Sequence, residues 1–380
     1  LSIEDCIDAV DVETICILVG MMLLVAVIKN SGIFEYIAIK AAKIAKGRPW
    51  PIMVIFILIT AVCSGMLDNV TTVLLVGPMT LAITNILKVD PVPYIITQIM
   101  ASNIGGTATL IGDPPNIMIG SAAKLSFVDF ILNTGVATVF VIIVGLICMY
   151  FIYGRKLFVT DESIAKVMQL DENKAIKDRK LMHESVIVII LVALCFIFHD
   201  QLGVQSCTVA IAAACIMLLI GGQEPEEIIA DVEWPTILFF IGLFIVVGGM
   251  KKVGVITMLA NGLISITHGN MVVTMMVILW VSAIVSSFLD NIPFVATLIP
   301  MILTMQSEGM DVAPIWWALS LGACLGGNGT LIGASANVVL SGISKNNGHP
   351  ITFGQYFKIG FPMMILSIIV CSVFLLIRFA

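Results

Sequence analysis

Charged residues are scarce in this chain, since only 12% of its 380 residues are Asp, Glu, Lys or Arg. Soluble domains typically contain about 25% charged residues, so the shortage argues against a soluble fold. The net charge of −6 and the lack of a basic stripe also argue against a nucleic-acid partner. Instead, 59% of the residues are hydrophobic and the mean hydropathy is +1.10. This composition predicts an all-α polytopic protein of the lipid bilayer.

The usual signatures of metal sites, disulfides and hydrolytic enzymes are also missing. The nine cysteines lie in apolar runs without a Cys-x-x-Cys pair, and we expect them to be buried thiols. The four histidines, His183, His199, His268 and His349, lie near the ends of predicted segments. No His-Glu-x-x-His or Gly-x-Ser-x-Gly sequence occurs. We therefore expect no enzyme and no cofactor.

Apolar runs that cross a bilayer, for which about 20 residues are needed, recur along the whole chain. Two of the stretches, 94–122 and 314–343, are too long and too polar in the middle for one regular helix. The predicted membrane segments are 14–29, 52–67, 70–87, 94–122, 130–153, 185–199, 205–221, 235–250, 271–289, 292–305, 314–343 and 356–377.

A glycine-rich pattern occurs twice in the chain. Gly-Gly-x-x-Thr-Leu-Ile-Gly-x-x-x-Asn occupies residues 105–116 and again 326–337. Each copy follows an Asp-Asn pair in apolar sequence, first at Asp68 and then at Asp290. Other residues repeat at the spacing that separates these two pairs, namely Thr14 with Thr236, Gly20 with Gly242, and Gly32 with Gly254. The chain is therefore two copies of one large unit.

The repeat divides the chain into three parts. Residues 1–154 form the first repeat and 185–380 the second, joined by a soluble connector, 155–184, with seven Lys/Arg and six Asp/Glu. The repeat mates of the two helices expected in 185–221 would precede Leu1. We therefore expect that the first two helices of the first repeat belong to N-terminal sequence not included here.

Basic residues predict that the two repeats are inverted. The stretch 33–46, which has the periodicity of an interfacial amphipathic helix, carries Lys40, Lys43 and Lys46, and Arg155 and Lys156 open the connector. The positive-inside rule places both at the cytoplasmic face of the cell membrane. The helix mate is 255–268, and the corresponding stretch 262–270 carries no Lys or Arg, as expected for a copy in the opposite orientation.

The Asp-Asn pairs are the first half of a candidate site. A carboxylate inside an apolar run is costly unless it faces protein or water, so Asp68-Asn69, with Thr71 beside it, and Asp290-Asn291 predict ion binding. The alternative is a polar turn that joins two full spans at the membrane surface.

The repeated glycine motif is the other half. We expect Gly105-Gly106 and Gly326-Gly327 to interrupt helices and free backbone groups near the bilayer midplane; the alternative is close helix packing. Only the first copy has Asp113 followed by two prolines. The polar residues expected beside the two breaks are Asn103, Thr109, Asp113, Asn116, Asn328, Thr330, Ser335 and Asn337.

The charges of this region favour a cation. Lys88 is the only basic residue from 51 to 121, and none occurs from 270 to 344. A fixed cation for a dianionic substrate is therefore missing, whereas Asp68 and Asp290 offer carboxylates to a coupling H⁺ or Na⁺. Freed carbonyl groups with amide oxygens suit Na⁺. The candidate Na⁺ ligands are Asn69, Asn116, Asn291 and Asn337.

These motifs resemble the ion transporter superfamily, in the branch of arsenical pump permeases, NhaD-type Na⁺/H⁺ antiporters and the melanosomal P protein group. The resemblance implies a scaffold domain and a transport domain, two re-entrant hairpins with Asp-Asn at their tips, and a homodimer. Related dicarboxylate carriers have Ser-Asn-Thr at such tips. The motifs are Leu67-Asp68-Asn69-Val70-Thr71-Thr72 and Ile111-Gly112-Asp113-Pro114-Pro115-Asn116, with residues 103–106, 322–337 and 360–364.

Taken together, the sequence predicts a secondary active transporter that works by alternating access. Its cargo is an inorganic ion or a small anion or metalloid, of the arsenite type or coupled to Na⁺ or H⁺. The alternatives are a passive ion channel and a Na⁺-coupled carboxylate symporter. Cys63 and Cys324 lie close to the motifs but do not match across the repeat, and we expect them to be packing residues.

Overall fold

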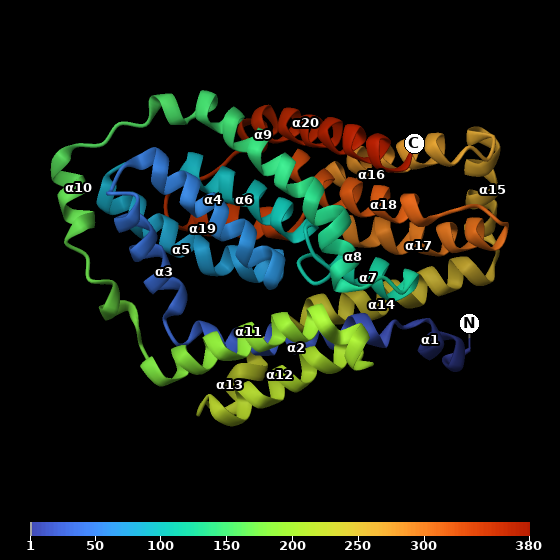
Figure 1. Cartoon of the computed structure of the whole chain (residues 1–380), viewed down its shortest axis with the longest axis horizontal. Helices are drawn as coiled ribbons and strands as arrows, with labels where there is room; N and C mark the ends of the chain where they lie inside the picture. The colour runs from blue at the N-terminus through green and yellow to red at the C-terminus, as the bar shows by residue number, and fades with distance from the viewer. Residues whose placement is uncertain (1) are drawn as a thin grey trace.

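The computed structural model describes residues 2–380, apart from the side chains of residues 199 and 200. His199, expected near a segment end, lies outside the described side chains. All regular structure in the described residues is helical, as predicted, and most helices run along the long axis of the molecule (Figure 1). Eight helices in this part of the chain are long and apolar enough to cross a membrane.

The helices form two layers that lie one above the other in Figure 1. One layer, called here the α2 layer, contains α2 (Val12–Lys29), α11 (Arg179–Leu202), α12 (Ser206–Ile220) and α14 (Trp234–Lys252), with the short helices α1 (Ile3–Ala9) and α13 (Pro225–Ala230). The other, called the hairpin layer, contains α4 to α9 and α16 to α20.

Two arm helices connect the layers at opposite ends of the molecule (Figure 1). They are α3 (Ile33–Ile44) and α15 (Val255–Thr267), which match the predicted stretches 33–46 and 255–268. Each arm begins after a glycine in the left-handed region, Gly32 with φ 81° and Gly254 with φ 79°. Such a turn favours glycine because a Cβ would be strained there.

Each arm leads into a helical hairpin of the hairpin layer. The first hairpin is α4 (Pro49–Met66) with α5 (Asn69–Leu87), and the second is α16 (Met271–Phe288) with α17 (Asn291–Ser307). The hairpins enter from opposite ends and their tips point to the middle of the molecule (Figure 1). The two repeats are therefore inverted relative to each other, as predicted.

Each hairpin packs against a broken helix, and both breaks lie where the sequence predicted them. The first broken helix is α6 (Val92–Thr107) with α7 (Pro114–Ala123). The second is α18 (Ala313–Gly326), the single turn η4 (Gly327–Gly329) and α19 (Ser335–Asn346). In both, a short non-helical stretch separates the half-helices.

Gly105 and Gly106 do not cause the first break, which corrects the sequence-based prediction, whereas Gly326 and Gly327 lie where α18 ends and η4 begins. Gly105 and Gly106 remain inside α6, and Gly326 ends α18 as a helical residue. A Cβ on Gly105 would lie 2.1 Å from the carbonyl oxygen of Ala61, and one on Gly326 would lie 2.7 Å from that of Ala283. The alternative of close helix packing therefore holds, because glycine lets each broken helix approach its hairpin.

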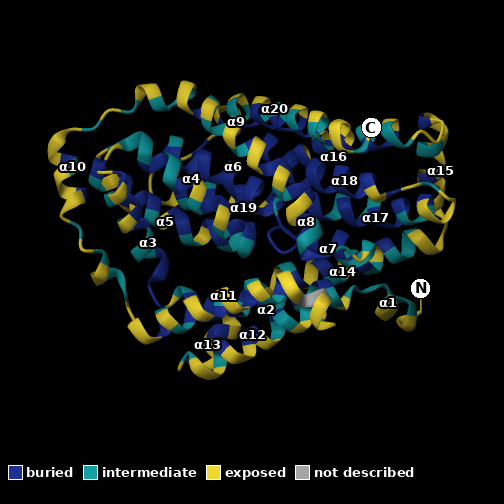
Figure 2. Ribbon diagram, viewed as in Figure 1, coloured by how far each residue is buried: buried dark blue, intermediate teal, exposed yellow. Residues whose placement is uncertain are grey.

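Each half ends in a long helix on the outside of the hairpin layer. These are α9 (Val136–Ile152), preceded by α8 (Phe127–Phe130) and the wider turn η1 (Ile131–Gly135), and α20 (Phe353–Phe379). Figure 2 shows exposed residues along the outer faces of both helices. Many of them are large and apolar, such as Phe140 and Ile143, as expected for a surface in contact with lipid.

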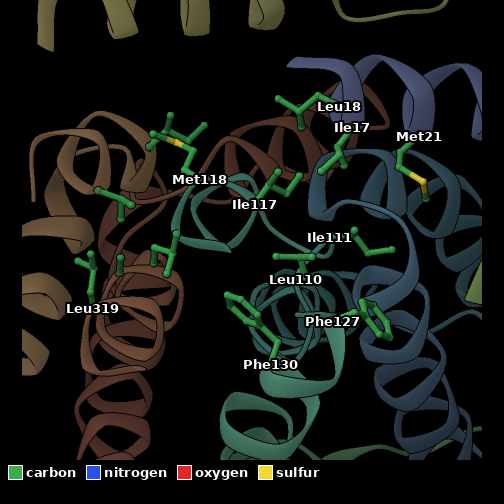
Figure 3. Packing of buried hydrophobic residues seen from close by; sticks show 14 of the residues in the cluster. Ile17, Leu18, Met21, Leu110, Ile111, Ile117, Met118, Phe127, Phe130 and Leu319 are labelled. Atoms are coloured by element: carbon green, nitrogen blue, oxygen red, sulfur yellow. The ribbon is translucent and has the colours of Figure 1, made fainter. Parts of the chain in front are cut away.

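The contact between the layers is apolar beside the first break. Ile17, Leu18 and Met21 of α2 face Leu110 and Ile117 of the hairpin layer (Figure 3), and all five are buried. Because none of these side chains hydrogen-bonds, the two layers meet here without directional bonds.

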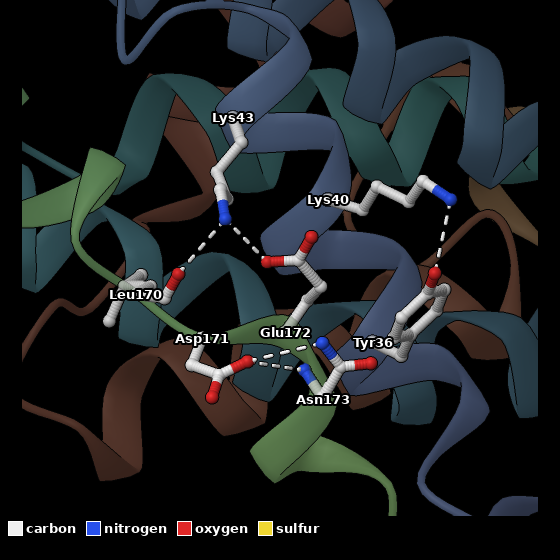
Figure 4. Close-up of polar contacts among 7 residues, drawn as sticks. All are labelled: Tyr36, Lys40, Lys43, Leu170, Asp171, Glu172 and Asn173. Atoms are coloured by element: carbon white, nitrogen blue, oxygen red, sulfur yellow. Dashed lines mark hydrogen bonds and ion pairs between the residues drawn. The ribbon is translucent and has the colours of Figure 1, made fainter.

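The connector between α9 and α11 lies at the α3 end of the molecule (Figure 1). It contains η2 (Gly154–Lys156), α10 (Asp161–Met168) and η3 (Glu172–Ala175). Lys43 Nζ lies 2.6 Å from Glu172 Oε2 and donates to the carbonyl oxygen of Leu170 at 3.2 Å (Figure 4). The hydrogen bond from Lys43 lowers the pKa of Glu172 below its ordinary value.

Candidate functional site

The tips of both hairpins meet at one side chain, the fully buried carboxylate of Asp113. Asn69 Nδ2 donates to Asp113 Oδ1 at 3.3 Å. Asn291 Nδ2 donates to Asp113 Oδ1 at 3.4 Å and to Oδ2 at 3.2 Å. Since the hairpins come from opposite ends, tips that share one partner do not lie at opposite membrane surfaces. The shared partner favours the prediction of one common site over that of two separate surface turns.

The carboxylates of the two Asp-Asn pairs have local partners. Asp68 caps α5 and accepts from the backbone N–H of Thr71 at 2.8 Å and from the hydroxyl of the same residue. Asp290 caps α17, accepting from the backbone N–H of Ile292 and from Ser335 Oγ, both at 3.0 Å. Each therefore satisfies the N–H groups at the start of its own helix.

Asp113 also lies at the start of a helix, but it does not cap it. It precedes α7, whose first two residues are Pro114 and Pro115 and carry no N–H group. The carboxylate makes no capping hydrogen bond, which leaves it free to face the hairpin tips. The equivalent residue before α19 is Ala334, so the second repeat has no such group.

The extended segments of the two breaks are held in the same way. Asn116 Nδ2 donates to the carbonyl oxygen of Thr109 at 2.9 Å, and Asn337 Nδ2 donates to that of Thr330 at 2.9 Å. All four residues are buried. These amides satisfy carbonyl groups that the broken helices leave without partners, which is necessary where water is excluded.

The threonines connect each break to its hairpin. Thr109 Oγ1 donates to the carbonyl oxygen of Gly65 near the first tip, and Thr330 Oγ1 donates to that of Ser287 near the second. Sequence reasoning missed two serines with the same symmetry, Ser64 and Ser286, which bond the carbonyl oxygens of α6 and α18 at 2.6 Å. They repeat at the spacing of the two Asp-Asn pairs, a signal that could have identified them.

The two broken helices also hold each other. Asn103 Nδ2 of the first donates to Asn337 Oδ1 of the second at 2.9 Å, and likewise to Asn328 Oδ1. In the reverse direction, Cys324 Sγ and Ser320 Oγ donate to Asn116 Oδ1 at 3.5 Å and 2.6 Å. Cys324 stands at the repeat position of Asn103, so it belongs to the site framework, whereas sequence reasoning treated it as packing.

A cavity of about 30 Å³ lies beside Asp113, where the two layers meet. It has room for one or two water-sized species. Glu233 and Thr236 at the start of α14 were not foreseen as part of its lining. Thr236 is the repeat mate of Thr14, a match that could have marked it. The polar residues around the cavity are Asp68, Asn69, Asp113, Glu233, Thr236, Asn291 and Ser335.

The site carries negative charge without a fixed positive partner. None of the ion pairs within the described part of the chain involves Asp68, Asp113 or Asp290. The described residues also contain no group of three or more His, Cys, Asp or Glu side chains arranged around a metal ion.

Residues 1–322 match the citrate transporter family. The chain belongs to this family of transporters. An uncharacterized transporter of Mycobacterium bovis is 42% identical over 374 residues, which cover 97% of this chain and 87% of the relative. The human P protein is 32% identical over 456 residues, which cover 99% of this chain but only 54% of the P protein. The predicted resemblance to the P protein group is thus confirmed.

One solved structure supports the fold of this family member. The YdaH transporter of Alcanivorax borkumensis, whose crystal structure has an unusual topology, aligns with a TM-score of 0.66. The alignment covers 94% of this chain and 84% of YdaH at 15% sequence identity. At that identity the likeness concerns the fold alone.

Proposed function

We propose that this protein is a secondary active transporter that carries a small ion or anion across a cell membrane by alternating access. One observation carries the proposal. Two hairpin tips and two broken helices, contributed by inverted repeats, converge on a closed polar site in the middle of the molecule. Broken helices at matching positions of inverted repeats are typical of binding sites in secondary transporters.

In this proposal the two helix layers move relative to each other. The α2 layer would act as the scaffold, and the hairpin layer as the transport domain. A cleft of about 280 Å³, lined by Glu13 and Lys124, lies between the layers toward one end of the molecule. A second of about 400 Å³, lined by Lys29 and Lys177, lies between them toward the α3 end. Movement of the hairpin layer along the apolar contact would open the central site to each cleft in turn.

The proposal also covers the orientation of the protein in the membrane and its oligomeric state. The connector 155–184 and the basic arm α3 lie at one end, which we assign to the cytoplasm because of their Lys and Arg residues. The scaffold would pair with a second copy of the chain to form a homodimer.

For the cargo we propose an inorganic ion of the Na⁺/H⁺ or arsenite type. The name of the family raises a carboxylate such as citrate as a second candidate. Among the described residues, no Lys or Arg lines the central cavity. Carboxylates are usually bound by Arg or Lys, so the charges of the cavity favour the first candidate.

The direct test uses the purified protein in proteoliposomes on a solid-supported membrane. Concentration jumps of Na⁺, H⁺, arsenite and citrate would be applied, each with and without a gradient of Na⁺ or pH. We expect a saturable current with one inorganic cargo, and accumulation against its gradient. Flux that follows only its own gradient and does not saturate would instead identify a passive channel.

A further inference from the structure

The three carboxylates at the centre of the molecule are of two kinds. Asp68 and Asp290 each accept a backbone N–H from the first turn of their own helix, as helix caps do. Asp113 accepts no backbone N–H through its side chain. The amides that donate hydrogen bonds to it are those of Asn69 and Asn291, one from each hairpin tip.

These amides hold Asp113 weakly. The N–H···O distances are 3.2 Å, 3.3 Å and 3.4 Å, at or beyond the long end of the usual range of about 2.7–3.2 Å. Asp113 is also fully buried. A buried carboxylate without an opposite charge is costly, so Asp113 favours uptake of a proton or a cation.

The space next to Asp113 suits a small hard cation. The cavity of about 30 Å³ is faced by oxygen-bearing side chains from five helices or their caps, including Asn69, Asn291 and Ser335. A bound proton needs no cavity, whereas a metal ion needs both room and several oxygen ligands. Carboxylate, amide and hydroxyl oxygens are ligands that hard cations prefer.

Three of the helix ends around the cavity, those of α5, α17 and α7, do not favour an anion, whereas α14 and α19 begin there without a side-chain cap. A free helix N-terminus attracts anions through its N–H groups. The N-termini of α5 and α17 are already capped by Asp68 and Asp290. The N-terminus of α7 lacks its first two N–H groups, because these positions are Pro114 and Pro115.

The symmetric asparagines are not available as ion ligands, although the sequence suggested them. Asn116 Oδ1 already accepts from Ser320 and Cys324, and Asn337 Oδ1 accepts from Asn103. Their Nδ2 atoms are bonded to backbone carbonyl groups. A separate Na⁺ site in each repeat, with Asn116 or Asn337 as a ligand, would therefore require these hydrogen bonds to break.

We propose that the protein binds a single Na⁺ ion on Asp113, shared by the tips of both hairpins. This inference rests on the proposed transport function and deepens it. Asn69 and Asn291 donate Nδ2 to the carboxylate, which the thiol of Cys324 also contacts. Rotation of either amide by half a turn presents Oδ1 to Na⁺ instead, because the two ends of the group have the same shape. Ser335 lies at the same cavity and offers a hydroxyl oxygen.

The other acidic groups near the cavity also favour the binding of a cation. Asp68 and Glu233 line it, and Asp290 is joined to its rim through Ser335. The thiol of Cys324, which donates to Asn116, carries no positive charge. No basic residue among the described residues lines the cavity, so the surrounding charges attract a cation to Asp113.

The test measures binding of radioactive Na⁺ to the purified full chain in nanodiscs, independently of transport. We expect saturable binding of one Na⁺ per chain, displaced by unlabelled Na⁺ but not by choline. Asp113→Asn should abolish the saturable binding. Asp68→Asn and Asp290→Asn retain an oxygen for the helix cap but remove a nearby negative charge, so they should weaken Na⁺ binding without abolishing it.

Glu162→Gln provides a matched control, because it removes an exposed carboxylate on the connector, where the residue pairs with Lys166 at the surface. It should bind Na⁺ as the wild type does. A monodisperse elution profile and a thermal melting curve would show that each variant is folded.

The outcomes separate this inference from the proposed function. Two Na⁺ per chain, no saturable binding in the wild type, or unchanged binding in a folded Asp113→Asn variant would each overturn the single shared site. If Asp113→Asn removes Na⁺ binding but no ion gradient drives transport by the wild type, the Na⁺ site stands and the coupled-transporter proposal fails.

Discussion

The two inverted repeats have nearly the same hydrogen-bond framework but different charges. Asn116 with Thr109 and Asn337 with Thr330 form equivalent bonds of 2.9 Å. Between these residues, at equivalent positions, the first repeat has Asp113 and the second has Ala334. The comparison separates two kinds of polar residue. The repeated asparagines and threonines hold the two breaks in the same way, whereas Asp113 adds a charge that only the first repeat has.

A second difference concerns the arm helices. Gly32 and Gly254 occupy equivalent left-handed turns. The connector covers the first, since Ala175 O lies 2.1 Å from the position of a Cβ on Gly32 and the backbone N–H of Lys177 donates to Ser31 O at 3.0 Å. Nothing lies within 4 Å of such a Cβ on Gly254. The first arm is therefore fixed by the connector, and the second is not.

The largest effect is expected where the charges of the repeats differ. Asp113→Asn should abolish ion-coupled transport, because the cation loses its carboxylate ligand. It should also make the protein more stable in Na⁺-free buffer, since it removes a buried unpaired charge. Thermal unfolding with and without Na⁺ measures this. Na⁺ should raise the melting temperature of the wild type and leave that of Asp113→Asn unchanged. A lower melting temperature for the variant without Na⁺ would contradict the account.

Substitution of Gly105 and of Gly326 by alanine should destabilise the protein by different amounts. Gly105→Ala places a Cβ 2.1 Å from a backbone oxygen, so we expect a cost of about 3 kcal/mol or more, the upper end for overpacking. Gly326→Ala has more room, at 2.7 Å, and should cost about 1–3 kcal/mol. Fluorescence-detected melting of the two variants gives the order. Equal melting temperatures would show that the helices separate freely at these contacts.

Substitution of Thr109 and of Thr330, which connect the two breaks to the hairpins, should lower the stability by equal amounts. Thr109→Val and Thr330→Val each remove a buried hydrogen bond to a carbonyl oxygen near a hairpin tip. We expect each to cost about 1–3 kcal/mol, with closely similar shifts in melting temperature. A shift confined to one variant would mean that the framework is symmetric in geometry but not in energy.

The smallest effect is expected at the connector. The pKa of Glu172 is lowered by Lys43, so its contribution to docking is present above the ordinary pKa of 4.5 and is lost as the pH falls through the lowered value. Hydrogen exchange at residues 172–178, corrected for intrinsic rates, should therefore increase as the pH falls below the ordinary pKa of 4.5. Glu172→Gln should cause the same increase at neutral pH. Hydrogen exchange around Gly254 should not change in either experiment. An increase there as well would contradict the claim that the contact of Glu172 with Lys43 stabilises only the first arm.

Much of the fold could be predicted from the sequence because it depends on local patterns. Apolar runs, the constant spacing of the repeated residues and the basic arm α3 indicated the helices, the repeat and its inversion. The role of Gly105 was predicted wrongly. A glycine pair in sequence does not distinguish a break from a close contact, and the contact is with Ala61, a residue of another helix.

The site was harder to predict, for a related reason. The Asp-Asn pairs and the glycine motifs indicated which segments meet. The roles of Asp113 and Cys324 depend on contacts between the two repeats, and an internal alignment shows only that these residues have no equivalent. Two prolines after Asp113 were a usable signal, because they remove the N–H groups that an ordinary helix cap would bind.

The most direct test of the central claim is a cryo-EM structure of the full chain in nanodiscs with Na⁺, compared with the same protein in choline. The account predicts one Na⁺-dependent density, in contact with Asp113 and with the side chains of Asn69 and Asn291. Two symmetric densities, one beside Asn116 and one beside Asn337, would contradict it.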